Sequence, residues 1–267
     1  MPVPCACTIA GSDSCGGAGV QADLRAFAAS GIFGASVITA VTAQNTTGVR
    51  GTWTVPPDAI ADQITAVFDD LPVAACKTGM LSDAPAIRAV DSTLPSGIPL
   101  VVDPVMVATS GARLLAEDAV EALTRLLLPR AVLTTPNLPE AEVLSGRPIA
   151  EVDDMVAAAD EIRNLGVGAV LVTGGHLSGD RVVDVLVDGR DPLVMERDRL
   201  SGSYHGSGCT LSAAITAYCA TGLPVRGSVC RGHELAHRAL ACAIPARSGV
   251  FLPDPLCRRS PGPEYQP

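Results

Sequence analysis

The sequence predicts an α/β protein built on a mostly parallel sheet with helices on both faces. Short, nearly continuous apolar runs alternate with amphipathic, helix-like runs over most of the 267 residues. Most of the apolar runs end beside polar residues or glycine. The composition, 48% hydrophobic but only 3% aromatic, indicates one substantial aliphatic core.

The first half of the chain supplies the beginning of this alternation. "PCACTIA" predicts a strand, "GSDSCGGAG" a glycine loop, and "VQADLRAFAASG" a helix that ends on Gly31. Further strands are expected at "ASVITAV", "VAACK", "IPLVVD", "AVLTT" and "GAVLVT", and helices around 57–69, 84–94, 116–128, 138–145 and 152–165. Ligands of such sheets bind beyond the carboxyl ends of the strands.

The second half adds a hairpin and two helices. Apolar residues alternate on both sides of Asp188-Gly189 within 181–198, which predicts a hairpin joined to the sheet. Helices are expected near 208–222 and 226–243. Residues 1–250 then form one domain, and the proline-rich residues 251–267 are expected to be an extended or disordered tail.

Charge and cysteine content restrict the function classes. A net charge of −9 and a pI of about 4.8 disfavour nucleic acid and anionic membranes as partners. The N-terminal residues show no basic region or long apolar run, so a cytoplasmic location is expected. The nine cysteines are odd in number and widely spread, so most should be reduced. Cys5, Cys7 and Cys15 lack a nearby second CxxC or His pair, which favours buried small side chains over metal ligands.

The stretch "YHGSGCTL" predicts an anion-binding helix start. The amides of Gly206, Ser207, Gly208 and Cys209 would form a donor cluster, and the helix dipole adds about half a positive charge there. Such a hole stabilises a phosphoryl group during transfer. The same field should lower the pKa of the Cys209 thiol and make it a base or polar contact for an attacking hydroxyl; an idle thiol is the alternative. Neither a Walker A nor a GxGxxG motif is present.

Three strand ends place further polar groups at the same edge of the sheet. Asp103 follows "PLVVD", Asn137 and Glu140 follow "AVLTT", and two glycines follow "LVT" in "VTGGH". Each also has an ordinary interpretation: a turn before proline for Asp103, a capping box for Asn137 and Glu140, and a tight turn for the glycines. Their coincidence at one edge favours a binding site.

The segment "HELAH" at 233–237 matches the HExxH zinc pattern. A catalytic zinc needs a third protein ligand, and the remaining residues supply no further His and Glu constellation. A solvated helix face is therefore the preferred interpretation.

Seven motifs together resemble one known family. They are "TIAGSDSCGGAGVQADLRAFAASG", "SVITAVTAQNTTGV", "KTGML", "VVDPVM", "TPNLPEAE", "GAVLVTGGH" and "GSGCTLSAAI", in order between residues 5 and 245. The chain is thereby similar to hydroxymethylpyrimidine/phosphomethylpyrimidine kinases of thiamine biosynthesis, in the ribokinase-like superfamily. The resemblance implies a three-layer αβα fold, a homodimer, and ATP- and Mg²⁺-dependent phosphorylation of 4-amino-5-hydroxymethyl-2-methylpyrimidine and then of its monophosphate.

The resemblance also implies roles for individual residues. Gln44 and Asp23 would bind the aminopyrimidine, with Gly11 and Met80 lining its ring. The phosphates and Mg²⁺ would be organised by a second set, in which Asp103 and Glu140 hold the metal through water: Asp103, Asn137, Glu140, Thr173 and Gly175. Residues 206–209 would form the anion hole, with Cys209 as is typical of the pyrimidine kinases.

Two departures from the family pattern keep alternatives open. Thr173 stands where many members have Lys, and Ser207 replaces a common Thr. A pyridoxal kinase on the same scaffold is one alternative. A pyrimidine-binding sensor that has lost phosphoryl transfer is the other.

Overall fold

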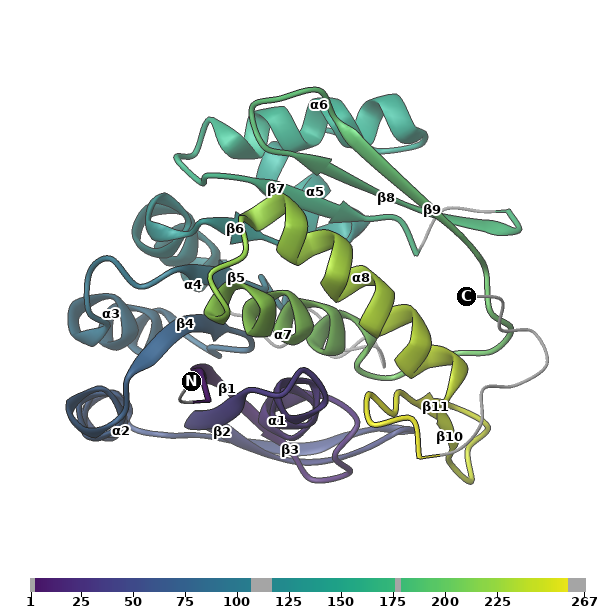
Figure 1. The fold of residues 1–267 in the computed structure, drawn as a ribbon. Helices are drawn as coiled ribbons and strands as arrows, with labels where there is room; N and C mark the ends of the chain where they lie inside the picture. Colours follow the sequence, from purple (N-terminus) through teal and green to yellow (C-terminus); the bar gives the residue numbers. More distant parts are fainter. Residues whose placement is uncertain (1–2, 107–116, 176–178, 259–267) are drawn as a thin grey trace.

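A computed structural model describes residues 3–106, 117–175 and 179–258, and it is organised around a nine-stranded sheet (Figure 1). The strand order is β3-β2-β1-β4-β5-β6-β7-β8-β9. The strands from β2 to β7 in that order run parallel to one another. At the two ends of the sheet, β3 pairs antiparallel with β2, β8 pairs antiparallel with β7, and β9 pairs antiparallel with β8. The strands are β1 (Cys5–Asp13), β2 (Phe33–Asn45), β3 (Gly48–Thr54), β4 (Val73–Thr78), β5 (Leu100–Val102), β6 (Leu133–Thr134), β7 (Val170–Thr173), β8 (Arg181–Val187) and β9 (Leu193–Asp198).

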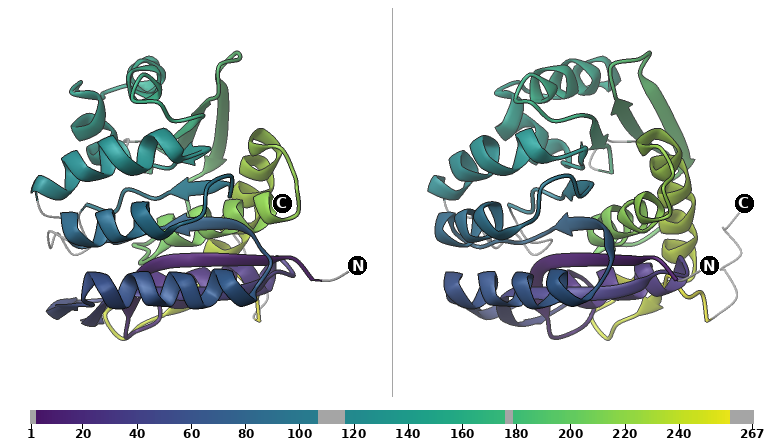
Figure 2. Two further views of the ribbon diagram at one scale, coloured as in Figure 1. Left: turned by 90° about the vertical axis from the view of Figure 1, so that its left-hand side faces the viewer. Right: turned by 60° about the vertical axis from the view of Figure 1, so that its left-hand side comes forward.

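Helices cover both faces of this sheet, which gives the expected three layers (Figure 2). One face carries α1 (Gly19–Ala29), α7 (Ser207–Ala220) and α8 (Val225–Ala241). The other carries α2 (Pro57–Asp70), α3 (Ala84–Thr93), α4 (Glu117–Ala122), α5 (Leu138–Ser145) and α6 (Val152–Arg163). The α/β class and the mostly parallel sheet are confirmed.

The strand alternation assigns side chains to the two layers. Cys7 and Ile9 of β1 pack in the core under α2 and α3, whereas Ala6 packs toward α1 and α7. In β4, Cys76 joins the first core and Ala75 the second. Because neighbouring residues point to opposite faces, Lys77 points toward α1 and α7.

Two elements differ from expectation. The predicted helix over 116–128 is interrupted: α4 continues as a π-helical segment (Leu123–Leu127) and one 3₁₀ turn (Leu128–Arg130), while residue 116 lies outside the described residues. The edge strand β3 carries no alternating apolar pattern, and it was not expected. It forms through main-chain pairing with β2, in which Trp53 lies opposite Val41.

The expected boundary at residue 250 lies too early. Phe251–Leu252 form β11, which pairs with β10 (Ile244–Pro245), and Asp254 is buried. Cys257 forms a disulfide with Cys242, and the other seven cysteines are free. Residues 251–258 therefore belong to the folded domain, because their backbone and apolar groups are satisfied against α8 and the turn before α7. The rest of the predicted tail lies outside the described residues.

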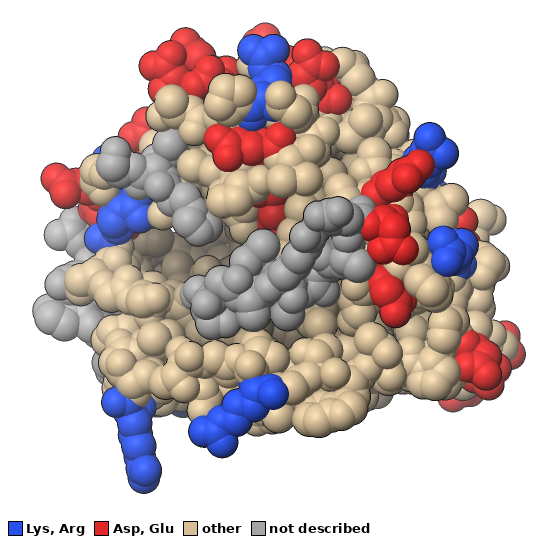
Figure 3. Space-filling model, turned by 180° about the vertical axis from the view of Figure 1, so that it is seen from behind, with Lys and Arg blue, Asp and Glu red and all other residues tan. Residues whose placement is uncertain are grey.

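The surface is acidic, in keeping with the net charge. Figure 3 shows acidic side chains along the upper edge of one face, over α6, whose first turn contains Asp153 and Asp154. Within the described residues, no helix has the length and apolar character needed to cross a membrane.

Candidate active site

The carboxyl ends of β1, β4, β5, β6 and β7 and the start of α7 meet at one edge of the molecule. The start of α7 depends on close backbone contacts. Gly206 caps the helix with φ +88°, and a Cβ there would overlap the carbonyl of Gly17. Gly19 has φ +58° and lies equally close to the carbonyl of Gly11. Only glycine fits these positions, because a side chain would meet backbone and because φ is positive.

The predicted anion hole is therefore held in place by the glycine loop of residues 14–19. A helix that begins at Ser207 leaves its first amides without acceptors inside the helix. No side chain of the described residues caps this end. The amides and the dipole can act on an anion.

A buried lysine lies beneath the hole. Lys77 has no exposed side-chain surface, and its Nζ is 2.8 Å from Asp23 Oδ1 and 3.9 Å from Asp103 Oδ2. Thr8 Oγ1 donates to Asp23 Oδ2 (2.6 Å), and Ser212 Oγ donates to Asp103 Oδ2 (2.8 Å). Burial lowers the pKa of Lys77, but Asp23, Cys209 and Asp103 more than offset this and raise it above its ordinary value. The ammonium is thus charged at neutral pH.

Sequence reasoning did not identify Lys77 as a functional residue. A signal existed, because lysine ends the otherwise apolar run "VAACK". Lysine is almost never fully buried unless it is paired, so its place in a central strand pointed to a partner elsewhere in the chain.

The structure assigns Asp23 a different place from the one expected. Its side chain is fully buried, and each carboxylate oxygen already accepts a hydrogen bond. Asp23 forms an ion pair with Lys77, and its side chain has no exposed surface that could contact a pyrimidine. Helix periodicity could not distinguish a buried from an exposed position for this residue.

The expected lowering of the Cys209 pKa is wrong. Burial raises the pKa of this thiol to about 12; Lys77 opposes the shift, and Asp103 and Asp23 add to it. Loss of water and two nearby carboxylates both favour the neutral thiol. The thiol is protonated at neutral pH, so it can donate a hydrogen bond but is a poor base.

Asp103 and Glu140 form a second charged group at the ends of β5 and β6. The capping box is present: Glu140 N–H donates to Asn137 Oδ1, and Asn137 N–H donates to Glu140 Oε2, both at 3.0 Å. Met106 N–H donates to Glu140 Oε1 (3.2 Å). Burial, followed by repulsion from Asp103, raises the pKa of Glu140 to about 8. The capping interpretation is confirmed, and the site interpretation of Asn137 and Glu140 stays a prediction.

These two carboxyl groups fit a hard divalent cation. Mg²⁺ is bound by oxygen ligands, often one or two carboxylates with water and substrate phosphates. Two buried carboxylates that repel each other, with Glu140 protonated more readily than usual, are stabilised by a cation between them.

The region predicted to bind the pyrimidine centres on Gln44. Its Nε2 lies 3.5 Å from His205 Nε2, and its Oε1 accepts from Thr42 Oγ1 (3.3 Å). Gln44 and His205 line a cavity of about 150 Å³. Gly11 and Met80 are neighbours, since a Cβ on Gly11 would lie 3.1 Å from Met80 Sδ.

The residues predicted to bind the nucleotide phosphates continue into the loop after β7. Thr173 pairs with Asn137 in an isolated bridge, and Gly174 N–H donates to Asp184 Oδ1 (2.9 Å). A Cβ on Gly174 would overlap the Val183 carbonyl, so glycine is required there. Gly175 is exposed, whereas the histidine of "VTGGH" lies outside the described residues.

The HExxH segment does not form the wholly solvated helix face that was expected. His233 is buried, and its Nε2 lies 2.9 Å from Asp184 Oδ2. Glu234 is exposed beside Arg231 instead. Helix α8 packs one side of this motif on α7, which the local pattern does not reveal.

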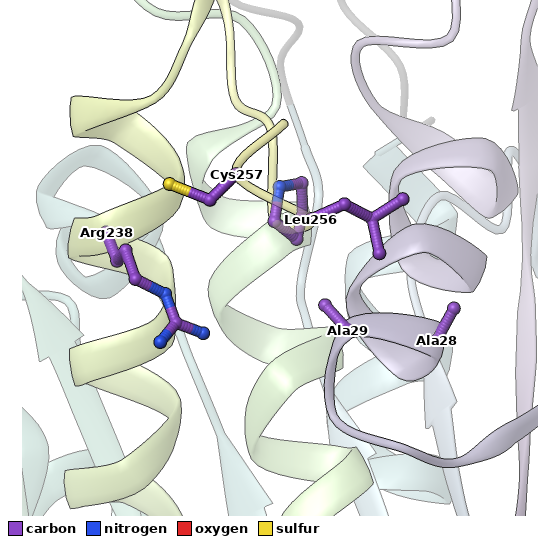
Figure 4. A pocket seen from close by; sticks show the side chains of 6 residues that line it. Ala28, Ala29, Arg238, Leu256 and Cys257 are labelled. Atoms are coloured by element: carbon purple, nitrogen blue, oxygen red, sulfur yellow. The ribbon is translucent and has the colours of Figure 1, made fainter. Parts of the chain in front are cut away.

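A larger cavity lies away from this edge. It has a volume of about 420 Å³ and is bordered by Ala28, Ala29, Arg238, Leu256 and Cys257 (Figure 4). It contains none of the predicted site residues.

Comparison with known proteins agrees with this geometry. The family "Phosphomethylpyrimidine kinase" matches residues 13–253. A hydroxymethylpyrimidine/phosphomethylpyrimidine kinase of Rhizobium meliloti is 48% identical, over 89% of this chain and 91% of the relative. The thiamine biosynthesis bifunctional protein ThiED of Geobacter sulfurreducens is 46% identical, over 91% of this chain and half of the relative.

Solved structures show the same fold. A phosphomethylpyrimidine kinase from Clostridium difficile is 44% identical, with a TM-score of 0.77 over 88% of this chain and 99% of its own. The ADP complex of a Bacillus subtilis pyridoxal kinase is 35% identical, with a TM-score of 0.86 over 95% of this chain and 97% of its own. This chain therefore belongs to the phosphomethylpyrimidine kinase family.

Proposed function

We propose that the protein transfers the γ-phosphoryl group of ATP to 4-amino-5-hydroxymethyl-2-methylpyrimidine, and a second phosphoryl group to the resulting monophosphate. The observation that carries the proposal is the meeting, in a chain of this family, of the α7 amides, the buried Lys77 and the Asp103–Glu140 pair at one sheet edge. Related pyridoxal kinases crystallised with ADP or AMP-PCP support ATP as the donor.

The residues present supply positioning and charge stabilisation. Lys77 and the first amides of α7 face the charge that develops on a transferring phosphoryl group. Phosphoryl transfer passes through a loose transition state in most analyses, so the attacking hydroxyl needs little help from a strong base. The protonated Cys209 thiol orients that hydroxyl, and Gln44 reads the aminopyrimidine from the cavity it shares with His205.

Asp103 and Glu140 would hold Mg²⁺, directly or through water. When bound, the ion neutralises charge on the phosphates. A homodimer and a cytoplasmic location belong to the same proposal. The exposed Val41 of β2 and Trp53 of the edge strand β3 lie opposite each other and offer an apolar surface for a second copy.

Product analysis with Mg-ATP and the hydroxymethylpyrimidine tests the proposal. The wild type should give the monophosphate and then the diphosphate. Cys209→Ala should slow both steps about 100-fold, because a positioned donor is lost. Cys230→Ala, at an exposed cysteine on α8, is the matched control and should leave both steps unchanged.

Other outcomes select the alternatives. Product from pyridoxal but not from the pyrimidine would favour a pyridoxal kinase, and several of the similar solved structures are pyridoxal kinases. Pyrimidine binding without ATP consumption would favour a sensor.

A further inference from the structure

Three donor atoms of different chemistry converge beside the pyrimidine cavity. Asp13 Oδ2, Cys15 Sγ and His205 Nε2 all lie within 4.8 Å of one another. Asp13 Oδ2 is 2.8 Å from His205 Nε2 and 3.3 Å from Cys15 Sγ. The sequence alone indicated no ligand set near Cys15, because His205 lies 192 residues from Asp13 and only the fold brings them together.

These separations are close to those of a tetrahedral site. Bond lengths of about 2.3 Å for Zn–S and about 2.0 Å for Zn–N and Zn–O place neighbouring ligands about 3.3–3.5 Å apart. The Asp13–Cys15 separation is about 0.2 Å shorter than this and the Asp13–His205 separation about 0.5 Å shorter, so a cation would move the donors slightly apart. Asp13 and His205 are 3% and 5% exposed, and Cys15 is half-buried, so the fold already holds the donors together.

The surroundings orient these donors as the outer groups of a metal site do. Asp13 Oδ1 accepts from Cys15 N–H (3.0 Å), and Asp13 Oδ2 accepts from Ala18 N–H (2.8 Å). The ring of His205 packs against Gly17, where any Cβ would overlap it. On the other side, His205 lines the 150 Å³ cavity with Gln44, which leaves room for water.

We propose that Asp13 Oδ2, Cys15 Sγ and His205 Nε2 bind one Zn²⁺ or a similar borderline-soft divalent cation, with water as the fourth ligand. Thiolate and imidazole select such a cation over Mg²⁺, which prefers an all-oxygen shell. Arg25 lies near Asp13 and Cys15, and its positive charge weakens the site relative to a structural zinc centre. A bound cation would fix His205 and draw it away from Gln44. Zn²⁺ should therefore inhibit the pyrimidine kinase, a consequence that rests on the proposed function.

Titration of the metal-free full chain with Co²⁺ tests the site itself. Thiolate coordination gives a charge-transfer absorption, which should saturate at one Co²⁺ per chain and disappear when Zn²⁺ is added. Cys15→Ser should weaken binding at least about 100-fold and remove the absorption. Cys230→Ser is the matched control, because its thiol is exposed and distant in sequence from the cluster, and it should behave as wild type. An absorption that survives in Cys15→Ser, or that vanishes in Cys230→Ser, would overturn the proposal.

Thermal unfolding gives a second, independent measurement. Zn²⁺ should raise the midpoint of the wild type and of Cys230→Ser, but not those of Cys15→Ser or Cys15→Ala, because a cation that binds only the native state stabilises it. Equal shifts in all four proteins would contradict the site. With Mg-ATP saturating, Zn²⁺ should lower wild-type turnover at least about 10-fold and spare Cys15→Ser. A chain without kinase activity would refute the proposed function and leave the Co²⁺ result to decide the metal site.

Discussion

The two halves of the active-site edge compensate buried charge in different ways. On the side of β1, β4 and α7, the buried Lys77 lies between Asp23 and Asp103, and Thr8 and Ser212 complete the hydrogen bonds of these carboxylates. On the side of α5, Glu140 accepts only backbone N–H groups, and no cation among the described residues is paired with it. In the first half, Lys77 supplies one positive charge, which compensates one of the two carboxylates.

This difference separates a half whose charges are fixed by the fold from a half whose charge state depends on a ligand. A buried ion pair with complete hydrogen bonds keeps its geometry without a ligand, so the anion hole is preorganised. A buried carboxyl without a cation takes up a proton instead, which is why the pKa of Glu140 rises to about 8. On the proposed function, a bound cation would favour the ionised form of Glu140 in the second half.

The largest effect is expected from removing the charge that balances the first half. Lys77→Met leaves Asp23 and Asp103 buried without their cation, and it should cost about 3–5 kcal/mol of unfolding free energy. The value of kcat/KM should fall about 10³-fold, because the hole loses its positive charge. Denaturant unfolding and steady-state kinetics measure the two effects.

The double variant Lys77→Met with Asp23→Asn separates stability from catalysis. It should recover much of the stability, since one uncompensated carboxylate is gone, but not the activity. Near wild-type stability and turnover in Lys77→Met would show that the ion pair does not organise the site.

The second half should make the free energy of unfolding depend on pH. The pKa of Glu140 is about 8 in the folded chain and about 4.5 when unfolded, so the folded state binds the proton more tightly. Stability is then lost as pH rises from about 4.5 to about 8, by on the order of 4 kcal/mol. Glu140→Gln should remove this part of the pH dependence.

Unfolding free energies at pH 5 and pH 8 measure the difference between the two proteins. Saturating Mg-ATP should reduce it, because a cation replaces the proton at Glu140 in the wild type. Identical pH profiles for wild type and Glu140→Gln would mean that Glu140 stays ionised in the folded chain.

The preorganisation of the first half also depends on residues 251–258. Phe251 N–H donates to the Ser203 carbonyl (2.8 Å), and His205 N–H donates to the Phe251 carbonyl (2.9 Å). A chain that ends at Val250 loses these bonds just before α7, so its turnover should fall about 10-fold and its unfolding midpoint should drop by several degrees. A chain that ends at Arg258 is the control and should match wild type in both assays. Loss of activity in the control as well would place the support further along the chain.

The smallest effect is expected from His233, which supports the second half through Asp184 and the amide of Gly174. His233→Asn should cost about 1–2 kcal/mol of stability and raise KM for ATP severalfold with little change in kcat. A chelator at a concentration that leaves Mg²⁺ in excess should change the activity of wild type and His233→Asn equally, because His233 holds no metal that activity requires. Abolished turnover in His233→Asn, restored by added zinc, would revive the HExxH interpretation.

The sequence by itself determined the fold class, most elements and the sheet edge at which most of the predicted site residues lie. The helix over 138–145 was predicted with the bounds that the structure has, because a capping box and an apolar face are both local signals. The glycines before α7 likewise predicted where this helix begins. Asp103, Asn137 and Glu140 followed from strand order, since parallel strands end at a common edge.

Only the tertiary structure decided which of these groups are buried and what they face. It brought Lys77 to Asp23, His205 to Asp13 and His233 to Asp184, pairs separated by 54, 192 and 49 residues. It also reversed the expected pKa shift of Cys209, because a helix dipole is a local property whereas desolvation and neighbouring carboxylates depend on packing. Local patterns therefore identify where a site lies, and long-range packing sets the charge state of the residues within it.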